Sequence, residues 1–419
     1  MHKIFYRTLE HLLRDIDDSA GDEQMLNEVV EKLVNGEQAE HFGIVSGRVY
    51  RERALDYVLI ESIGEYGESI EGKIVSKEYP PVQELMENRR SIFSPDSPGW
   101  DPHLEEQFSH LSNAAIAVGR HPGYILSLGF ERDDPDELLI MLESIRASIG
   151  LKLRQGALES QLRQAQLIQS SLLPDILPEL DGFEMAARVH AADEVGGDVY
   201  DVQELDTGMV GLMVADASGH GLPAALQARD VVVGMRMGQT HNEKITAQVK
   251  RLNQVVHQTL LTSRFITLFY AEIEDTGNVT YVNAGHCPPL LFTTSGEVFE
   301  LQVSGPVLGP LPDAVYRRGS MTLRPGEMLV LVTDGILERN APGEEASEED
   351  EGVEFGRENL MRVCQENRER SCGEIADAVV KAVRAFGGHA PLDDDMTVVV
   401  VKRLNREGDK MQESLVPLN

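Results

Sequence analysis

The chain has 419 residues, of which 42% are hydrophobic, so it can form two or more packed domains and is not disordered as a whole. Its 70 acidic and 38 basic side chains give a formal charge of −32, which argues against nucleic acid or a membrane surface as a partner. The three scattered cysteines form no disulfide or zinc pattern. The sequence also shows neither a signal peptide nor an apolar run of the ~18 residues that span a bilayer, so we expect a cytoplasmic protein.

Residues 1–150 mix strand-like apolar runs, such as FGIVSGRVYR and DYVLIESIG, with helical segments. The last of these, residues 134–155, repeats its apolar positions at helical spacing. This pattern predicts an α+β domain over residues 1–150.

Residues 151–173 continue as a helical linker that Pro174 ends. Apolar side chains recur in it at intervals of four, three and seven, at Leu158, Leu162, Ala165 and Leu172. A dimeric coiled coil and a rigid amphipathic spacer explain this stripe about equally well. The first interpretation predicts a homodimer.

Residues 174–405 form strands separated by Gly, Pro and Asn turns, with two helical stretches at 222–237 and 242–261. Grouped strands and helices, instead of strict alternation, predict an α+β domain with mostly antiparallel pairing. We expect the acidic stretch GEEASEEDEGVE, residues 343–354, to be a surface loop, and residues 406–419 to be a polar tail.

Carboxylates stand at the ends of four strand-like segments in this domain: VGGDVYD, LMVADASGHG, MLVLVTDG and DDDMTVVVV. No Lys or Arg lies within three residues of Asp198, Asp216 or Asp334. Burying a carboxylate without a partner costs several kcal/mol of folding free energy. A divalent cation could compensate the charges of these carboxylates in place of the missing basic side chains. Mg²⁺ and Mn²⁺ prefer such oxygen ligands.

Simpler explanations exist for each motif. A single Asp-Gly is usually a turn, and His220 and His286 are more often turn or core histidines than ligands. Asp216, Ser218 and His220 are too close in sequence to converge as a nucleophilic triad, and a G-x-S-x-G motif is absent, so a serine hydrolase is disfavoured.

The ordered motifs VGGDVYD, DASGHGLPAAL, FITLFYAEIE, VNAGHCPPLL, VLVTDGILE and DDDMTVVVVKR resemble the SpoIIE-like (RsbU-type) serine phosphatases, a branch of the metal-dependent type 2C protein phosphatases. The resemblance covers about 230 residues from near Pro174 to Leu404. It implies a sandwich of two antiparallel β-sheets flanked by helices, with a centre that holds two Mn²⁺ or Mg²⁺ ions. It also implies hydrolysis of phosphoserine or phosphothreonine on a regulatory protein, often an anti-anti-sigma factor in a partner-switching pathway.

Carried over by position, the resemblance assigns the metal ligands and catalytic centre to Asp198, Asp216, Asp334, Asp394 and the backbone carbonyl of Ala217. It places Gly197, Ser218, His220 and Asp395 around these ligands. A catalytically silent scaffold that binds a phosphoprotein is the alternative function, and retention of all four acidic positions disfavours it.

Residues 1–150 resemble a GAF sensory domain through the ending GYILSLGFERDDPDELLIMLESIRASIGLKL. This resemblance implies an input domain for a small molecule or protein that the sequence does not identify. Dimerisation is the other role that we expect of this domain.

Overall fold

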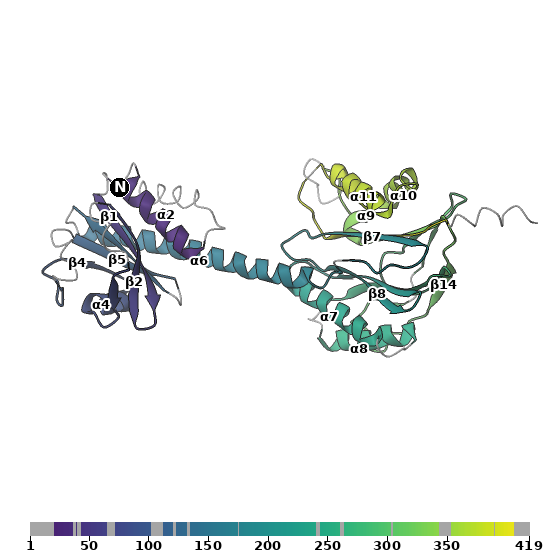
Figure 1. The fold of residues 1–419 in the computed structure, drawn as a ribbon, viewed down its shortest axis with the longest axis horizontal. Coiled ribbons are helices and arrows are strands. Elements are labelled where there is room, and N and C mark those ends of the chain that lie inside the picture. The colour runs from purple at the N-terminus through teal and green to yellow at the C-terminus, as the bar shows by residue number, and fades with distance from the viewer. Residues whose placement is uncertain are drawn as a thin grey trace, which may run out of the picture. The chain divides into compact units, whose positions relative to one another are not determined.

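The computed structural model describes residues 21–36, 39, 43–64, 72–101, 112–119, 123–131, 135–174, 176–239, 244–259, 264–302, 305–342, 353–388 and 390–405. The chain divides into two compact units, Met1–Gln161 and Leu162–Asn419 (Figure 1). Within the described ranges, none of the helices combines the length and the apolar composition required to cross a bilayer.

The first unit contains one antiparallel sheet of six strands in the order β3-β2-β1-β6-β5-β4. The strands are β1 (Ile44–Arg53), β2 (Asp56–Gly64), β3 (Ile74–Ser76), β4 (Arg90–Phe93), β5 (Ser112–Val118) and β6 (Tyr124–Phe130). Helices α2 (Asp22–Asn35) and α6 (Pro135–Ser170) pack on one face, and α4 (Pro80–Asn88) packs on the other. The central strand β6 is buried along its whole length because helices cover both faces.

The second unit contains two five-stranded antiparallel sheets. One has the order β14-β11-β10-β9-β8, and its strands are β8 (Asp198–Asp206), β9 (Met209–Ala217), β10 (Ile266–Glu274), β11 (Asn278–Ala284) and β14 (Gly319–Thr322). The other has the order β13-β12-β15-β16-β7, and its strands are β7 (Phe183–His190), β12 (Leu290–Phe292), β13 (Val298–Glu300), β15 (Met328–Val332) and β16 (Met396–Arg403).

The two sheets pack face to face between two layers of helices (Figure 1). Helices α7 (Leu222–Gln239) and α8 (Ile245–Thr259) cover the β8–β9–β10 sheet, and α9 (Asp334–Leu337), α10 (Gly356–Glu366) and α11 (Cys372–Phe386) cover the other. The position of strand β16 between the helices and the opposite sheet explains why its sequence is an unbroken apolar run. Val398 and Val400 face the helices, whereas Val399 and Val401 face the opposite sheet, so both faces are buried.

The α+β class and the helix-flanked antiparallel sandwich are confirmed. Helix α6 runs without a break through the boundary that we expected at residue 150 and ends four residues before Pro174. Residues 1–20, residues 343–352 of the acidic stretch, and the tail 406–419 lie outside the described residues, so the predictions made for them stay predictions.

Candidate metal centre

Two of the predicted ligands lie opposite each other in one sheet. Strand β8 begins at Asp198, and its antiparallel register with β9 pairs Asp198 with Asp216. Directly opposed residues have Cβ atoms about 5 Å apart. Asp198 is buried, with 3% of its surface exposed, and Asp216 is partly buried. The register therefore brings two carboxylates together at the end of the sheet.

Thr333 connects this pair to the second sheet. Its Oγ1 donates to Asp198 Oδ2 at 2.7 Å and accepts from the backbone N–H of Thr397 at 2.9 Å. Thr333 follows β15 and immediately precedes Asp334, the first residue of α9. Asp334 is thereby held close to the end of β8.

The three consecutive acidic residues before β16 have different hydrogen-bond partners. Asp395 accepts hydrogen bonds from the backbone N–H groups of Ala192 at 2.8 Å and Gly197 at 2.5 Å. Asp394 accepts from the N–H of Asp395 at 2.8 Å, and the exposed Asp393 pairs with Arg339 at 2.8 Å. Asp395 thus fixes the loop that leads into Asp198, and Asp393 turns away to Arg339.

Glycines permit this close approach of backbone and carboxylates. A Cβ on Gly197 would lie 2.5 Å from the carbonyl oxygen of Ala217, and a Cβ on Gly335 would clash with the carbonyl oxygen of Asp395. Any larger residue at either position would push these strand ends apart.

The acidic side chains repel one another. Burial raises the pKa of Asp216 to about 8, and the charges of Asp334, Asp394, Asp395 and Glu338 contribute to the increase. Burial followed by the charge of Asp216 also raises the pKa of Asp198 well above its usual value. A cation would relieve this repulsion and favour the ionised carboxylates.

No three Asp, Glu, His or Cys side chains in the described ranges are arranged so that they could hold a metal ion together. The donor chemistry nevertheless suits Mg²⁺ or Mn²⁺, because such ions use one or two carboxylates and retain several waters. The residues therefore fit divalent cations whose remaining ligands are backbone oxygen and water.

Residues 206–404 match the family model described as "Stage II sporulation protein E (SpoIIE)". This region is a SpoIIE-type phosphatase domain. The match includes Asp216, Asp334 and Asp394, whereas Asp198 lies eight residues before it.

Two named bacterial proteins are similar in sequence to this chain. The chain is 26% identical to Protein IcfG of Synechocystis over 296 residues, which are 64% of this chain and 45% of IcfG. It is 28% identical to Phosphoserine phosphatase RsbU of Bacillus subtilis over 251 residues, which are 59% of this chain and 72% of RsbU. The resemblance to this family is confirmed, although the chain spans less than half of IcfG.

The solved SiaA-PP2C domain of Pseudomonas aeruginosa has the same fold as the SpoIIE-type domain. It aligns with a TM-score of 0.52 and 23% identity, over 60% of this chain and 99% of that domain.

The predicted neighbours of the ligands lie around the same strand ends of the SpoIIE-type domain. The backbone N–H of buried Ala217 donates to the carbonyl of Gly197 at 3.2 Å. Ser218 Oγ accepts from the N–H of Phe265 at 2.9 Å, and His220 Nδ1 lies 2.9 Å from Asp193 Oδ2. Ser218 and His220 thus have different partners, as expected of a turn and not of a relay.

Three residues near the carboxylates were not singled out in the sequence. They are Thr333, Glu338 and Gln169. Gln169 lies in the last turn of α6, where its Oε1 accepts from the N–H of Gly196 at 3.1 Å and its Nε2 donates to the carbonyl of Gly196. In the sequence this glutamine only interrupts an apolar stripe, so no local pattern identified it.

His286 is a buried core histidine. Its Nδ1 lies 2.8 Å from Thr267 Oγ1, and its backbone N–H donates to Asn283 Oδ1 at 2.8 Å. Thr267 pairs with Asp216 in the sheet, so the histidine supports the strand next to the carboxylates. Burial lowers the pKa of His286 to about 4.

This histidine makes the protein less stable in acid. Between its ordinary pKa of 6.5 and the folded value of about 4, the unfolded chain takes up a proton that the folded chain excludes. The contribution of His286 to the free energy of unfolding is therefore complete above pH 6.5 and is lost as the pH drops through 4, by about 3 kcal/mol in total. Urea unfolding at pH 7 and pH 4.5 should show a larger loss in the wild type than in His286→Gln. Equal losses in the two proteins would contradict this assignment.

Proposed function

We propose that the chain is a metal-dependent protein serine/threonine phosphatase that hydrolyses phosphoserine or phosphothreonine on a regulatory protein. The observation that carries this proposal is the register pair Asp198 and Asp216, where burial and, after it, the charges of further carboxylates raise the pKa of Asp216 to about 8. The name of RsbU, a phosphoserine phosphatase, supports the same reaction. Following the family resemblance of the sequence motifs, the proposed substrate is an anti-anti-sigma type protein in a partner-switching pathway.

In this proposal two divalent cations, Mn²⁺ or Mg²⁺, bind to Asp198, Asp216, Asp334, Asp394 and the carbonyl of Ala217. When bound, such cations activate water and offset the charge of the phosphoryl group during in-line attack. Thr333 keeps the Asp198 carboxylate in one orientation through its hydrogen bond. Asp395 holds the loop at 192–197 in place, so that the backbone beside Asp198 is fixed before substrate binds.

Phosphate release by the full chain from a phosphoserine peptide, with Mn²⁺ present, tests this function. Turnover that saturates with peptide and metal would support a phosphatase. Peptide binding without phosphate release would instead identify the silent scaffold. A cytoplasmic location is part of the proposal, and the free thiols of Cys287, Cys364 and Cys372 agree with a reducing compartment.

We also propose that Gln169 is a positioning residue of the centre. It holds both the N–H and the carbonyl of Gly196, one residue before Gly197, whose N–H binds Asp395. Two hydrogen bonds of about 1 kcal/mol each correspond to roughly a tenfold or larger change in affinity. Gln169→Ala should therefore raise the Mn²⁺ dissociation constant about tenfold, measured by calorimetry without substrate.

The exposed Gln166 on the same helix provides the control. Gln166→Ala should bind Mn²⁺ as the wild type does. If Gln169→Ala also retained wild-type Mn²⁺ affinity, the proposed positioning role would be wrong.

Helix α6 presents apolar side chains that suit a second copy of the chain. Leu151, Leu158 and Ile168 are 64%, 57% and 61% exposed, and the first two are one heptad apart. We propose a homodimer through this helix. Sedimentation at micromolar concentration should show a dimer that Leu158→Glu dissociates, and a monomeric wild type would contradict it.

A further inference from the structure

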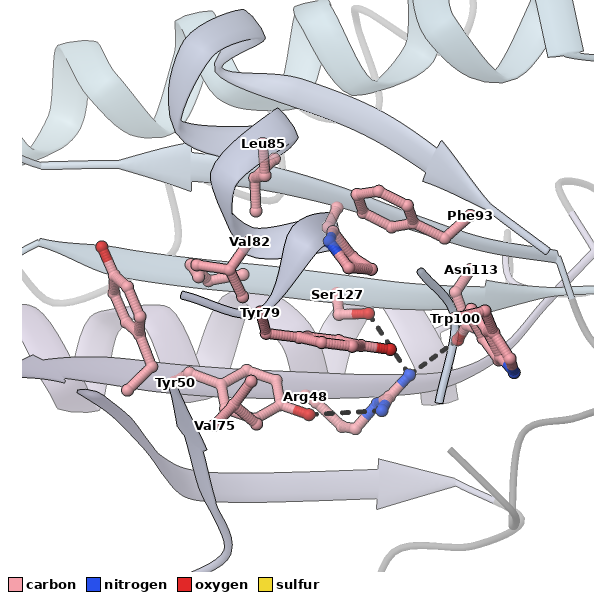
Figure 2. A pocket seen from close by; sticks show the side chains of 14 residues that line it. Arg48, Tyr50, Val75, Tyr79, Val82, Leu85, Phe93, Trp100, Asn113 and Ser127 are labelled. Carbon is pink, nitrogen blue, oxygen red and sulfur yellow. Dashed lines mark hydrogen bonds between the residues drawn. The ribbon is translucent and has the colours of Figure 1, made fainter. Parts of the chain in front are cut away.

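The first unit contains a cavity between α4 and the sheet (Figure 2). Its volume of about 60 Å³ is roughly four times what one water requires by the same measure. Three of its lining side chains, Val75, Tyr79 and Trp100, are only partly buried, so the cavity is open to solvent beside them. The space suits a molecule built on one small ring and is too small for a nucleotide.

The wall of this cavity is mainly carbon. Aliphatic side chains contribute from α4 and from β6, among them Val82, Leu85 and Ile125. The aromatic side chains of the wall are Tyr50, Tyr57, Tyr79, Phe93 and Trp100. Aromatic rings pack edge-to-face or offset against another ring, and such a pair is worth more than the apolar area that it buries. A ligand that is itself aromatic therefore gains most from this wall.

The charged side chain of the wall is bonded within the protein. Arg48, on β1, is only 3% exposed. Its Nη2 donates to Asn113 Oδ1 at 2.6 Å and to Ser127 Oγ at 3.3 Å (Figure 2). Its Nη1 donates to Tyr50 Oη at 3.2 Å. The guanidinium is therefore held by side chains of the protein itself.

The other two tyrosine hydroxyls of the wall also have protein partners. Tyr57 Oη donates to Met86 Sδ at 3.3 Å, and Tyr79 Oη accepts from the backbone N–H of Asp101 at 3.2 Å. Because these polar groups bond within the protein, the wall offers mainly ring and aliphatic carbon to a ligand. A charged group placed against such a surface would lose its hydration.

We propose that this cavity is a binding site for a small uncharged aromatic molecule, whose single ring packs against the aromatic side chains of the wall. The site lies in the first unit and uses none of the carboxylates that we propose as metal ligands. Its test measures binding alone, so failure here would leave the proposed phosphatase function untouched.

Trp100 provides a direct signal, because it lines the cavity and is the single tryptophan of the chain. The full chain is titrated with benzene and with cyclohexane, its saturated match, while tryptophan fluorescence is recorded. The larger apolar area of cyclohexane favours its transfer out of water, so benzene can bind more tightly only through its flat ring and its ring contacts. Benzene should bind more tightly than cyclohexane. Tighter binding of cyclohexane, or no saturable signal with benzene, would overturn the proposal.

A second pair of ligands tests the absence of charge. Benzamide and benzoate have nearly the same shape, and only benzoate is an anion. Benzamide should bind about ten times or more tightly, because the carboxylate of benzoate must give up its hydration in the cavity. If benzoate bound as tightly as benzamide or more tightly, the site would recognise an anion and the proposed ligand class would be wrong.

Two substitutions on β5 locate the binding. Ala115→Leu adds bulk to the cavity wall and should weaken benzene binding about tenfold or more. Ala117 lies on the same face of β5 and is similarly buried, but it is not among the described residues that line the cavity, so Ala117→Leu should bind benzene as the wild type does. Unchanged benzene affinity in Ala115→Leu would exclude this cavity as the site. The wild-type comparisons decide the proposal even if a variant fails to fold.

Discussion

Asp216→Asn is expected to reduce phosphate release by about a thousandfold or more, because in the proposed function Asp216 binds the catalytic cations, and removal of such a group costs several kcal/mol of transition-state stabilisation. Asparagine retains the shape of the side chain and removes its charge. Since neighbouring charges contribute to the raised pKa of Asp216, the same substitution should relieve repulsion in the metal-free protein. Its melting temperature without metal should therefore equal or exceed that of the wild type.

Asp206 provides a matched control for Asp216→Asn. It lies exposed at the other end of β8, so Asp206→Asn makes the same chemical change away from the cluster and should leave turnover unchanged. Steady-state phosphate release and thermal unfolding, measured on both variants, separate loss of chemistry from loss of fold. Wild-type turnover in Asp216→Asn would place the active centre elsewhere.

Removal of divalent cations with a chelator is expected to abolish turnover, and added Mn²⁺ should restore it. Burial and then the charge of Asp216 raise the pKa of Asp198, and burial and then the charges of Asp334 and Asp394 raise the pKa of Asp216. Bound cations would offset these effects by favouring the ionised carboxylates. By mass action, a cation at a hundred times its dissociation constant stabilises the folded state by about 2.7 kcal/mol. Mn²⁺ should therefore raise the melting temperature as well as the rate.

The thermal shift identifies where the cation binds. Mn²⁺ should stabilise Asp206→Asn as strongly as the wild type and Asp216→Asn much less. Full turnover in chelator would refute metal-assisted hydrolysis. A thermal shift that Asp216→Asn leaves intact would show that the stabilising ion binds at another site.

The sequence identified the strand ends of the candidate centre because a carboxylate at either end of an apolar run is a local pattern. It could not separate neighbouring acids whose partners lie far away in the chain. Asp201, three residues after Asp198, is buried and pairs with Arg236 on α7 at 2.8 Å. The consecutive acids Asp393, Asp394 and Asp395 likewise acquire different partners only through the fold.

Other contacts were beyond prediction for the same reason. The aromatic cavity at Arg48 depends on strands β1, β5 and β6 lying side by side, which brings Asn113 and Ser127 to a residue 65 or more positions away. The antiparallel α+β class was predictable because grouped apolar segments separated by turns stand out in the sequence, as β16 does with its unbroken buried run. The two-sheet sandwich followed only from the resemblance to the phosphatase family.

The hydrogen bonds of the Thr333 hydroxyl make the orientation of the Asp198 carboxylate sensitive to substitutions between the two sheets. This one oxygen links the two layers, since Asp198 begins a strand of one sheet and Thr397 belongs to the other. Any sliding of one layer over the other must lengthen one of its two bonds and rotate the Asp198 carboxylate. Substitutions in the apolar interior, such as at Leu331 or Val399, can therefore disturb the chemistry while the protein is still folded.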